Sequence, residues 1–210
     1  MVGAAANSVY SPFRFSGVVV QSWPYPHLEA ADFLEADIAD SLLTWLAREP
    51  EWQPRKLAGY AGYSDISLQA GDLPPQLDFL LAPHSLSYLR ICMAQIFQMD
   101  PEGYVRVTAH RLLAGSSLRA HCDVSPLRFT HRLIVQLNRG WTRGNGGLLC
   151  LFDGESSAKR RRHQKVIMPV HRSAFGFEIS DRSFHAVTRV ISGERYTLSY
   201  TFYPPSGKQV

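Results

Sequence analysis

The sequence predicts a mainly β domain with helices near its N-terminus, in which the strands form a barrel or sandwich braced on one side by those helices. Three observations support this fold class. The 210 residues are 45% hydrophobic, which suits one globular domain with a substantial core. Two stretches before residue 100 show helical spacing, and short strand-like segments follow from residue 104. No linker divides the chain, so residues 1–210 form one predicted domain, with helical support over about 28–100 and a core over about 104–203.

Helical periodicity defines the two N-terminal helices. Residues 28–49 place apolar side chains at intervals of three and four, and Pro50 is expected to end this helix. A second helix is predicted from about Ser85 to Gln98, before Asp100-Pro101. Between the two helices, residues 57–75 are punctuated by glycine and proline. We therefore expect a loop or lid there, which carries Tyr60 and Tyr63.

The second half of the chain is predicted to be strands. Its segments are short, rich in β-branched and aromatic residues, and in several places separated by turn residues such as Arg143-Gly144-Asn145-Gly146-Gly147. The predicted strands cover residues 104–113, 131–138, 147–152, 165–170, 173–179, 184–191 and 195–203.

Composition excludes several classes of protein. No apolar run approaches the roughly 20 residues that span a bilayer, and the N-terminus lacks the pattern of a secretory signal, so no membrane partner is expected. Three cysteines are sparse and odd in number, which favours a reducing, cytoplasmic location. The net charge of +4 comes largely from the basic run at residues 159–165, which we interpret as a solvated loop rather than a nucleic-acid site.

One constellation of residues points to metal chemistry. His121 and Asp123 are two apart, and residues i and i+2 of a strand share a face, so their side chains are expected to converge, with Cys122 facing away. His185 opens a later strand and can complete the set from across the barrel. Two imidazoles and one carboxylate occupy one face of an octahedral ion, as in non-haem Fe(II) oxygenases. The open positions suit a chelating 2-oxo acid and dioxygen.

Arg195, ten residues after His185, is a candidate anchor for the far carboxylate of such a co-substrate, because its planar guanidinium binds carboxylates bidentately. Thr197 and Ser199 are expected on the same face of this strand. The other histidines lack comparable spacing and are interpreted as structural or exposed: His27, His84, His110, His131, His163 and His171.

At these residues the chain resembles the Fe(II)- and 2-oxoglutarate-dependent dioxygenases, in particular the prolyl-4-hydroxylase-like branch. The likeness covers roughly residues 104–203. Besides the metal constellation it rests on Gly115, Gln136-Leu137-Asn138 with Trp141, Gly146-Gly147, and Arg195-Tyr196-Thr197-Leu198-Ser199.

The resemblance implies a double-stranded β-helix (jelly-roll) core, with His121, Asp123 and His185 as catalytic iron ligands and Arg195 as anchor for the C5 carboxylate of 2-oxoglutarate. It implies Fe(II), 2-oxoglutarate and dioxygen as cofactors, with ascorbate as a further candidate. Gln136 and Arg111 stand where tyrosines are usual in those hydroxylases. We count Thr197 and Gln136 with Arg195 as predicted cofactor-binding residues.

The favoured function is hydroxylation of an unactivated C–H bond in a small molecule, such as an amino acid or a biosynthetic intermediate. The freestanding size and the aromatic loop at Tyr60 and Tyr63 suit such a substrate. A retained Asp123 favours hydroxylation over halogenation, and desaturation or cyclisation stays open. The alternatives are a peptidyl (prolyl-type) hydroxylase, a nucleobase demethylase, which Thr201 disfavours because a second arginine is usual there, and a non-catalytic jelly-roll binding protein.

Overall fold

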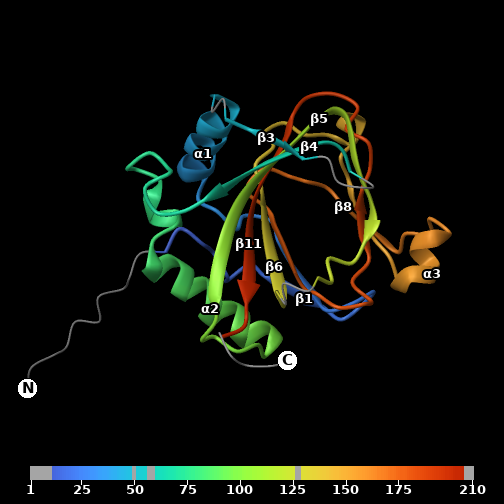
Figure 1. Ribbon diagram of the computed structural model, residues 1–210, viewed down its shortest axis with the longest axis horizontal. Coiled ribbons are helices and arrows are strands. Elements are labelled where there is room, and N and C mark those ends of the chain that lie inside the picture. Colours follow the sequence, from blue (N-terminus) through green and yellow to red (C-terminus); the bar gives the residue numbers. More distant parts are fainter. Residues whose placement is uncertain (1–10, 49–50, 56–59, 126–128, 206–210) are drawn as a thin grey trace, which may run out of the picture.

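The computed structural model describes residues 11–48, 51–55, 60–125 and 129–205, and it contains one curled, antiparallel sheet with helices beside it (Figure 1). The strand order is β1-β2-β9-β6-β11-β5-β10-β7-β8, and β4 pairs with both β5 and β3. The strands are β1 (Val19–Gln21), β2 (His27–Ala30), β3 (Gln53–Arg55), β4 (Tyr60–Leu68), β5 (Tyr104–His121), β6 (His131–Gln136), β7 (Leu149–Leu151), β8 (Lys165–Ile167), β9 (Ala174–Glu178), β10 (His185–Val187) and β11 (Arg195–Tyr203). The helices are α1 (Ala36–Arg48), α2 (Pro83–Phe97) and α3 (Gly154–Lys159), with short 3-10 turns at Asp78–Leu80 and Arg143–Asn145.

The mainly β fold class with N-terminal helices is confirmed. Five of the seven segments predicted as strands contain shorter strands, β6 to β10, and the last, 195–203, coincides with β11. The first, predicted over 104–113, instead continues to His121, and this long strand β5 pairs with β11 along its first half and with β10 at its end. None of the described helices is long and apolar enough to cross a membrane.

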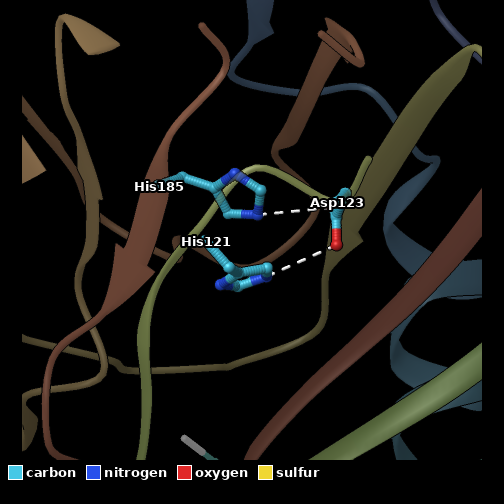
Figure 2. Close-up of side chains that lie close together, drawn as sticks. All are labelled: His121, Asp123 and His185. Carbon is cyan, nitrogen blue, oxygen red and sulfur yellow. Dashed lines mark ion pairs between the residues drawn. The ribbon is translucent and has the colours of Figure 1, made fainter. Parts of the chain in front are cut away.

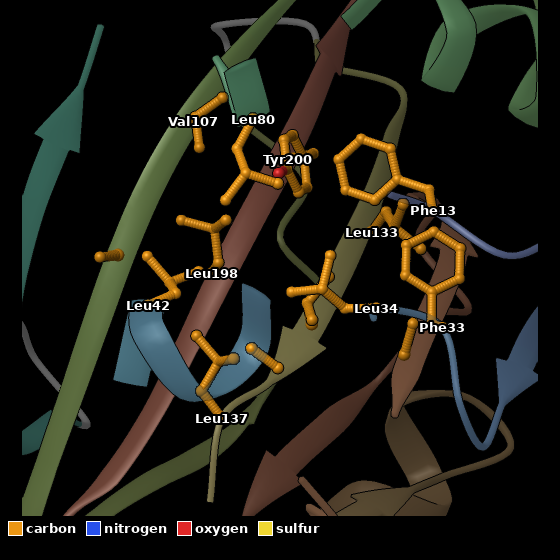
Figure 3. Close-up of a cluster of buried hydrophobic side chains, with 14 of the residues drawn as sticks. Phe13, Phe33, Leu34, Leu42, Leu80, Val107, Leu133, Leu137, Leu198 and Tyr200 are labelled. Carbon is orange, nitrogen blue, oxygen red and sulfur yellow. The ribbon is translucent and has the colours of Figure 1, made fainter. Parts of the chain in front are cut away.

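The main hydrophobic core lies between the sheet and the helices α1 and α2 (Figure 3). Leu42 and Leu46 of α1 and Leu89 and Met93 of α2 are fully buried in it. Burial of each such side chain stabilises the fold by about 1.5–3 kcal/mol. The helices thus fix the sheet from one side.

Strand β11 separates this core from the interior of the curled sheet. All nine of its residues are buried, although alternate side chains point to opposite faces. The apolar and aromatic residues at even positions pack in the main core: Tyr196, Leu198, Tyr200 and Phe202. Arg195, Thr197 and Ser199 face an interior cavity instead. One strand therefore carries both the packing surface and a row of polar groups.

The first predicted helix begins later than expected. Residues 27–30 form β2, in which Leu28 and Ala30 are buried and pair with β9, and α1 starts only at Ala36. The apolar residues before Ala36 satisfied helical spacing, but pairing with a distant strand overrides that local pattern. Pro50 lies outside the described residues. The second helix, predicted from Ser85 to Gln98, is confirmed as α2 and starts at Pro83.

The predicted loop or lid at residues 57–75 is wrong over its first part. Residues 60–68 form β4, which pairs with β5, and only the Gly/Pro-rich stretch after it is irregular. Its strand character depends on β5, which follows some fifty residues later and leaves no mark on the local sequence. Residues 57–59 and the side chain of Tyr60 lie outside the described part of the chain.

The basic run was expected to be a solvated loop between strands. Its first residue, Lys159, ends the short helix α3, and residues 160–164 are exposed and lead into β8. Helix α3 packs on the outer side of the sheet through a small core of Cys150, Phe152 and Ala158.

Candidate metal centre

The two histidines of the constellation meet because their strands pair. His121 at the end of β5 lies directly opposite His185 at the start of β10, and their ring centroids are 4.4 Å apart. His185 therefore comes from the neighbouring strand and not from across the barrel, as the sequence had suggested. Figure 2 shows both rings directed toward the carboxylate of Asp123.

Asp123 converges with His121 for a different reason from the one predicted. Strand β5 ends at His121, so strand alternation does not extend to Asp123. Asp123 instead has a left-handed backbone, with φ of 61°, which aspartate tolerates better than most residues. This turn brings Oδ1 to 3.4 Å from His121 Nε2 and Oδ2 to 3.4 Å from His185 Nε2.

Hydrogen bonds fix which nitrogen of each imidazole faces the carboxylate. Nδ1 of His121 donates to the carbonyl of Arg119 at 2.7 Å, and Nδ1 of His185 donates to the carbonyl of Ser183 at 2.9 Å. Because a carbonyl only accepts, each Nδ1 carries a proton, and Nε2 is the nitrogen left to face a metal ion. This is the arrangement of metal-ligating histidines held by a second hydrogen bond.

The charges also favour a metal ion. Burial by itself would raise the pKa of Asp123, but the Arg132 guanidinium, which donates to Oδ2 at 2.8 Å, and the two histidines hold it well below its usual range. Burial lowers the pKa of His185 to about 4, so this imidazole is neutral at neutral pH. One ligand atom from each of the three residues lies within 4.8 Å of the others. A neutral nitrogen and an ionised carboxylate are the protonation states that a divalent cation requires.

A buried cation lies deeper in the same cavity. Arg195 is 5% exposed, and its Nη2 donates to Gln136 Oε1 at 3.1 Å, whereas its Nε has no hydrogen-bond partner in the described structure. Burial lowers the pKa of Arg195 to about 10, so the group stays charged. Among the described residues no carboxylate lies within 4.0 Å of it. A buried, unpaired guanidinium is costly unless an anionic ligand completes it.

The predicted neighbours of Arg195 surround it. Thr197 lies opposite Gln136 of β6 on one side and opposite His110 of β5 on the other, so the three side chains form a row across three strands. Ser199 also lines the cavity, and its hydroxyl has no partner within the described part of the protein. This polar cradle fits the carboxylate of a small dicarboxylic acid. Arg111, by contrast, points away and lies over the ring of Trp52.

Gly147 leaves the space that Arg195 needs in this polar cradle. Its φ is +63°, and a Cβ there would lie 2.9 Å from Arg195 Cδ and 3.3 Å from Trp141. The Gly146-Gly147 turn of the sequence therefore packs directly against the arginine.

The metal donors and the arginine cradle line one cavity of about 240 Å³. Its apolar walls come from Leu112, Leu118, Ile134, Leu149 and Val187.

Three further residues line the same cavity and were not predicted as metal or cofactor-binding residues. Arg132 holds Asp123, and the Tyr63 hydroxyl is hydrogen-bonded to His110 Nδ1. His110 had been interpreted as structural or exposed, and Tyr63 as part of a lid. Arg132 was detectable, because it shares strand parity with the predicted Gln136 on β6, whereas His110 shares parity on β5 with Leu112, which was not predicted to line the site. The remaining histidines are structural or exposed as predicted.

Comparison with known proteins identifies the class to which this site belongs. The family model of the 2OG-Fe(II) oxygenase superfamily matches residues 107–203, which include all three donors and Arg195. This match, together with the prolyl hydroxylase relatives, confirms the expected resemblance to the 2-oxoglutarate- and Fe(II)-dependent oxygenases and, among them, to the prolyl-4-hydroxylases. The alternative of a non-catalytic binding protein gains no support from this match.

Several proteins that are similar to this chain are named as prolyl hydroxylases. The chain is 26% identical over 216 residues to Prolyl 3-hydroxylase OGFOD1 of Mus musculus, which covers 97% of this chain and 37% of that relative. It thus spans little more than a third of the curated relative's length. A prolyl-4-hydroxylase from Pseudomonas putida superposes with a TM-score of 0.68 at 20% identity, covering 84% of this chain and 91% of the other. A prolyl hydroxylase from Trichoplax adhaerens, in complex with a peptide fragment of the hypoxia inducible factor oxygen degradation domain, gives 0.62 at 14% identity over 84% and 83% of the two chains. These likenesses confirm the jelly-roll core.

Proposed function

We propose that this oxygenase hydroxylates a residue within a peptide or protein, of the prolyl type, with Fe(II), 2-oxoglutarate and dioxygen. Support comes from its similarity to proteins named as prolyl hydroxylases, one of them in complex with a peptide. The small-molecule substrate favoured by the sequence gains no support from these relatives. Its argument from an aromatic lid also fails, because Tyr63 lies on strand β4 inside the cavity.

The size of the cavity is the observation that carries the proposal. Its volume of about 240 Å³ lies below the roughly 300 Å³ at the lower end of pockets that enclose small-molecule ligands. The 2-oxoglutarate held at Arg195 would take part of that space. What remains suits one side chain of a larger substrate. Among the three donors His121 is the most accessible, since its side chain is 22% exposed, whereas that of His185 is 6% exposed.

Each residue of the site has a defined task in this proposal. Nε2 of His121, Nε2 of His185 and the Asp123 carboxylate would hold the iron, with Arg132 keeping the carboxylate ionised and oriented. Arg195, assisted by Thr197 and Gln136, would bind the C5 carboxylate of 2-oxoglutarate. Bound iron and co-substrate supply the oxidising power that cleaves an unactivated C–H bond. The apolar walls exclude water, and Asp123 occupies the position that a halogenase leaves open.

Hydroxylation of peptides provides the test. Proline-containing peptides and free proline would be incubated with the enzyme, Fe(II) and 2-oxoglutarate, and product would be measured by mass spectrometry together with succinate. We expect one added oxygen atom in peptides and no comparable turnover of free amino acids. An Asp123→Ala control separates enzymatic from adventitious oxidation. Efficient hydroxylation of a free amino acid, with none of the peptides modified, would return the substrate to the small-molecule class.

Two finer predictions accompany the proposal. We place the enzyme in the cytoplasm, and its three free cysteines, Cys92, Cys122 and Cys150, are compatible with a reducing compartment. Ascorbate as an auxiliary reductant stays a prediction, which succinate formation with and without ascorbate would check.

A further inference from the structure

A second, larger hollow lies on the opposite face of the strands that hold the metal centre. On β10, His185 lines the active-site cavity while Ala186 lines this hollow, and on β7 the same alternation separates Leu149 from Cys150. The hollow has a volume of about 660 Å³ and is bordered by α3, which lies beside the end of β5 in Figure 1. We call it the outer groove.

The charged side chains of the outer groove are all basic. They are Arg119, Lys159, Arg161 and Arg189, with His163 beside them, and no acidic residue in the described part of the chain lines the hollow. All five are exposed. The groove therefore collects cations from β5, from the end of α3 and the run that follows it, and from the segment after β10. Such a concentration of one sign of charge attracts and retains an anionic partner.

Most of these cations lack an internal partner. Within the described ranges no carboxylate lies within 4.0 Å of Arg119, Arg161 or Arg189. Lys159 pairs with Glu155 one helical turn away, at 2.8 Å on the exposed surface. An exposed pair of this kind contributes little and exchanges readily for another carboxylate. The three arginines are thus available for a ligand.

The outer groove adjoins the active site. Leu118 and Val187 line both the groove and the cavity, so the two hollows share a wall. Ala120 in the groove immediately precedes His121, and Ala186 immediately follows His185. A chain bound at the metal centre need pass only the ends of β5 and β10 to enter the groove.

The lining favours a peptide over a nucleic acid. Grooves that bind single-stranded nucleic acids combine positive charge with exposed aromatic rings on which bases stack. The aromatic residue of this lining is Phe152, which is 5% exposed and packs beneath α3. Acidic side chains need only the exposed guanidinium groups, which the groove provides in a geometry open to carboxylates.

We propose that the outer groove binds an acidic stretch of the peptide substrate, next to the residue that enters the active site. This inference rests on the proposed peptidyl hydroxylase function and adds to it the chemical class of the substrate. The groove selects sequences with aspartate and glutamate beside the target residue, while the cavity admits the target side chain itself.

Binding of labelled peptides to the full chain tests the groove without turnover. The probes are a fluorescein-labelled peptide with a central proline flanked on both sides by aspartate and glutamate, and its counterpart with asparagine and glutamine. Affinity would be measured by fluorescence anisotropy under anaerobic conditions with Fe(II) and 2-oxoglutarate. The test variant is Arg161→Glu/Arg189→Glu. Its matched control, Arg106→Glu/Arg143→Glu, makes the same change in net charge at exposed arginines outside the groove.

We expect the acidic peptide to bind wild type more tightly than the neutral one, and to lose affinity as ionic strength rises. The groove variant should bind the acidic peptide about tenfold more weakly, because two exposed attractions become repulsions. The control variant should bind it like wild type. Thermal unfolding of all three proteins checks that they fold alike, and if the double variant does not fold, Arg161→Glu alone replaces it.

Three results would overturn the proposal: equal binding of acidic and neutral peptides, an equal loss in both double variants, or tighter binding of a mixed-sequence single-stranded RNA that the groove variant abolishes. Turnover separates this proposal from the broader one. Hydroxylation of the neutral peptide without any acidic preference would refute the groove and keep the peptidyl hydroxylase. Charge-dependent binding without hydroxylation of either peptide would keep the groove and refute the peptidyl hydroxylase.

Discussion

Replacement of Arg195 by methionine should separate the stability of the protein from its affinity for 2-oxoglutarate. Methionine keeps much of the apolar stem of arginine and removes the guanidinium. In the protein without co-substrate this cation is buried, and its main partner is Gln136, an uncharged amide. The substitution therefore removes a group that destabilises the free protein and is expected to strengthen the binding of 2-oxoglutarate.

The expected changes in unfolding free energy and in affinity for 2-oxoglutarate follow from the structure. Burial lowers the pKa of Arg195 from its ordinary value to about 10, which corresponds to about 3 kcal/mol of unfavourable free energy in the charged form. Losing the bond to Gln136 costs about 1–3 kcal/mol. The free variant should thus unfold with nearly the wild-type free energy or slightly more. Loss of the charge-assisted bonds to the co-substrate carboxylate should weaken its binding about 100-fold.

Thermal unfolding with and without 2-oxoglutarate, in the presence of Fe(II) and absence of oxygen, measures both effects. At a concentration of about 100 times the wild-type Kd, the co-substrate stabilises wild type by about 2.7 kcal/mol, and a 100-fold weaker variant by about 0.4 kcal/mol. For a chain of this size these values correspond to shifts in Tm of about 5–10 °C and about 1 °C. An undiminished shift in the variant would move the anchor elsewhere. A free variant several kcal/mol less stable than wild type would refute the reasoning about the buried cation.

Three further changes test other parts of the site and the fold. Asp123→Ala or His185→Ala should abolish succinate formation by removing an iron ligand, and turnover surviving either change would contradict the ligand assignment. Burial lowers the pKa of His131 from 6.5 to about 4, so between those pH values the unfolded chain binds a proton that the folded protein does not. His131 should therefore contribute about 2 kcal/mol to the fall in wild-type stability between about pH 7 and about pH 5, and urea unfolding of His131→Phe should lack this contribution. Gly147→Ala should lower stability by about 2 kcal/mol and weaken 2-oxoglutarate binding, because its Cβ meets Arg195. Gly140→Ala has a similar backbone angle and open space around it, so it should lose stability through backbone strain alone, and equal losses at both sites would dismiss the crowding argument.

The candidate metal centre was predictable from the types of its residues and from their order along the chain. Two histidines, one carboxylate and one arginine in a fixed order indicated the ligand set before any contact was known. The geometric reason for Asp123 was nevertheless wrong. Alternation along a strand and a left-handed turn after the strand both bring residues two apart together, and sequence spacing cannot distinguish them.

The parts that could not be predicted depend on partners distant in the chain. The sequence of β4 is typical of a loop, and its strand conformation depends on pairing with β5. The same pairing places Tyr63 in the cavity. Leu28 satisfied a helical pattern, but its pairing with β9 decided its conformation. Parity with Gln136 indicates that Arg132 faces the cavity, but its hydrogen bond to Asp123, which joins strand β6 to the segment after β5, could not be predicted.

The burial of β11 on both faces has a consequence for how this protein can change over time. Deletion or insertion of one residue within the strand would exchange its two faces, turning Arg195 and Thr197 into the apolar core and Tyr196 and Leu198 into the cavity. The fold and the co-substrate site would fail together. A substitution along β11 changes one side chain, whereas an insertion or deletion changes the face of every residue after it. Variants of this protein should therefore keep the number of residues between Arg195 and the end of the strand, even where the residues themselves differ.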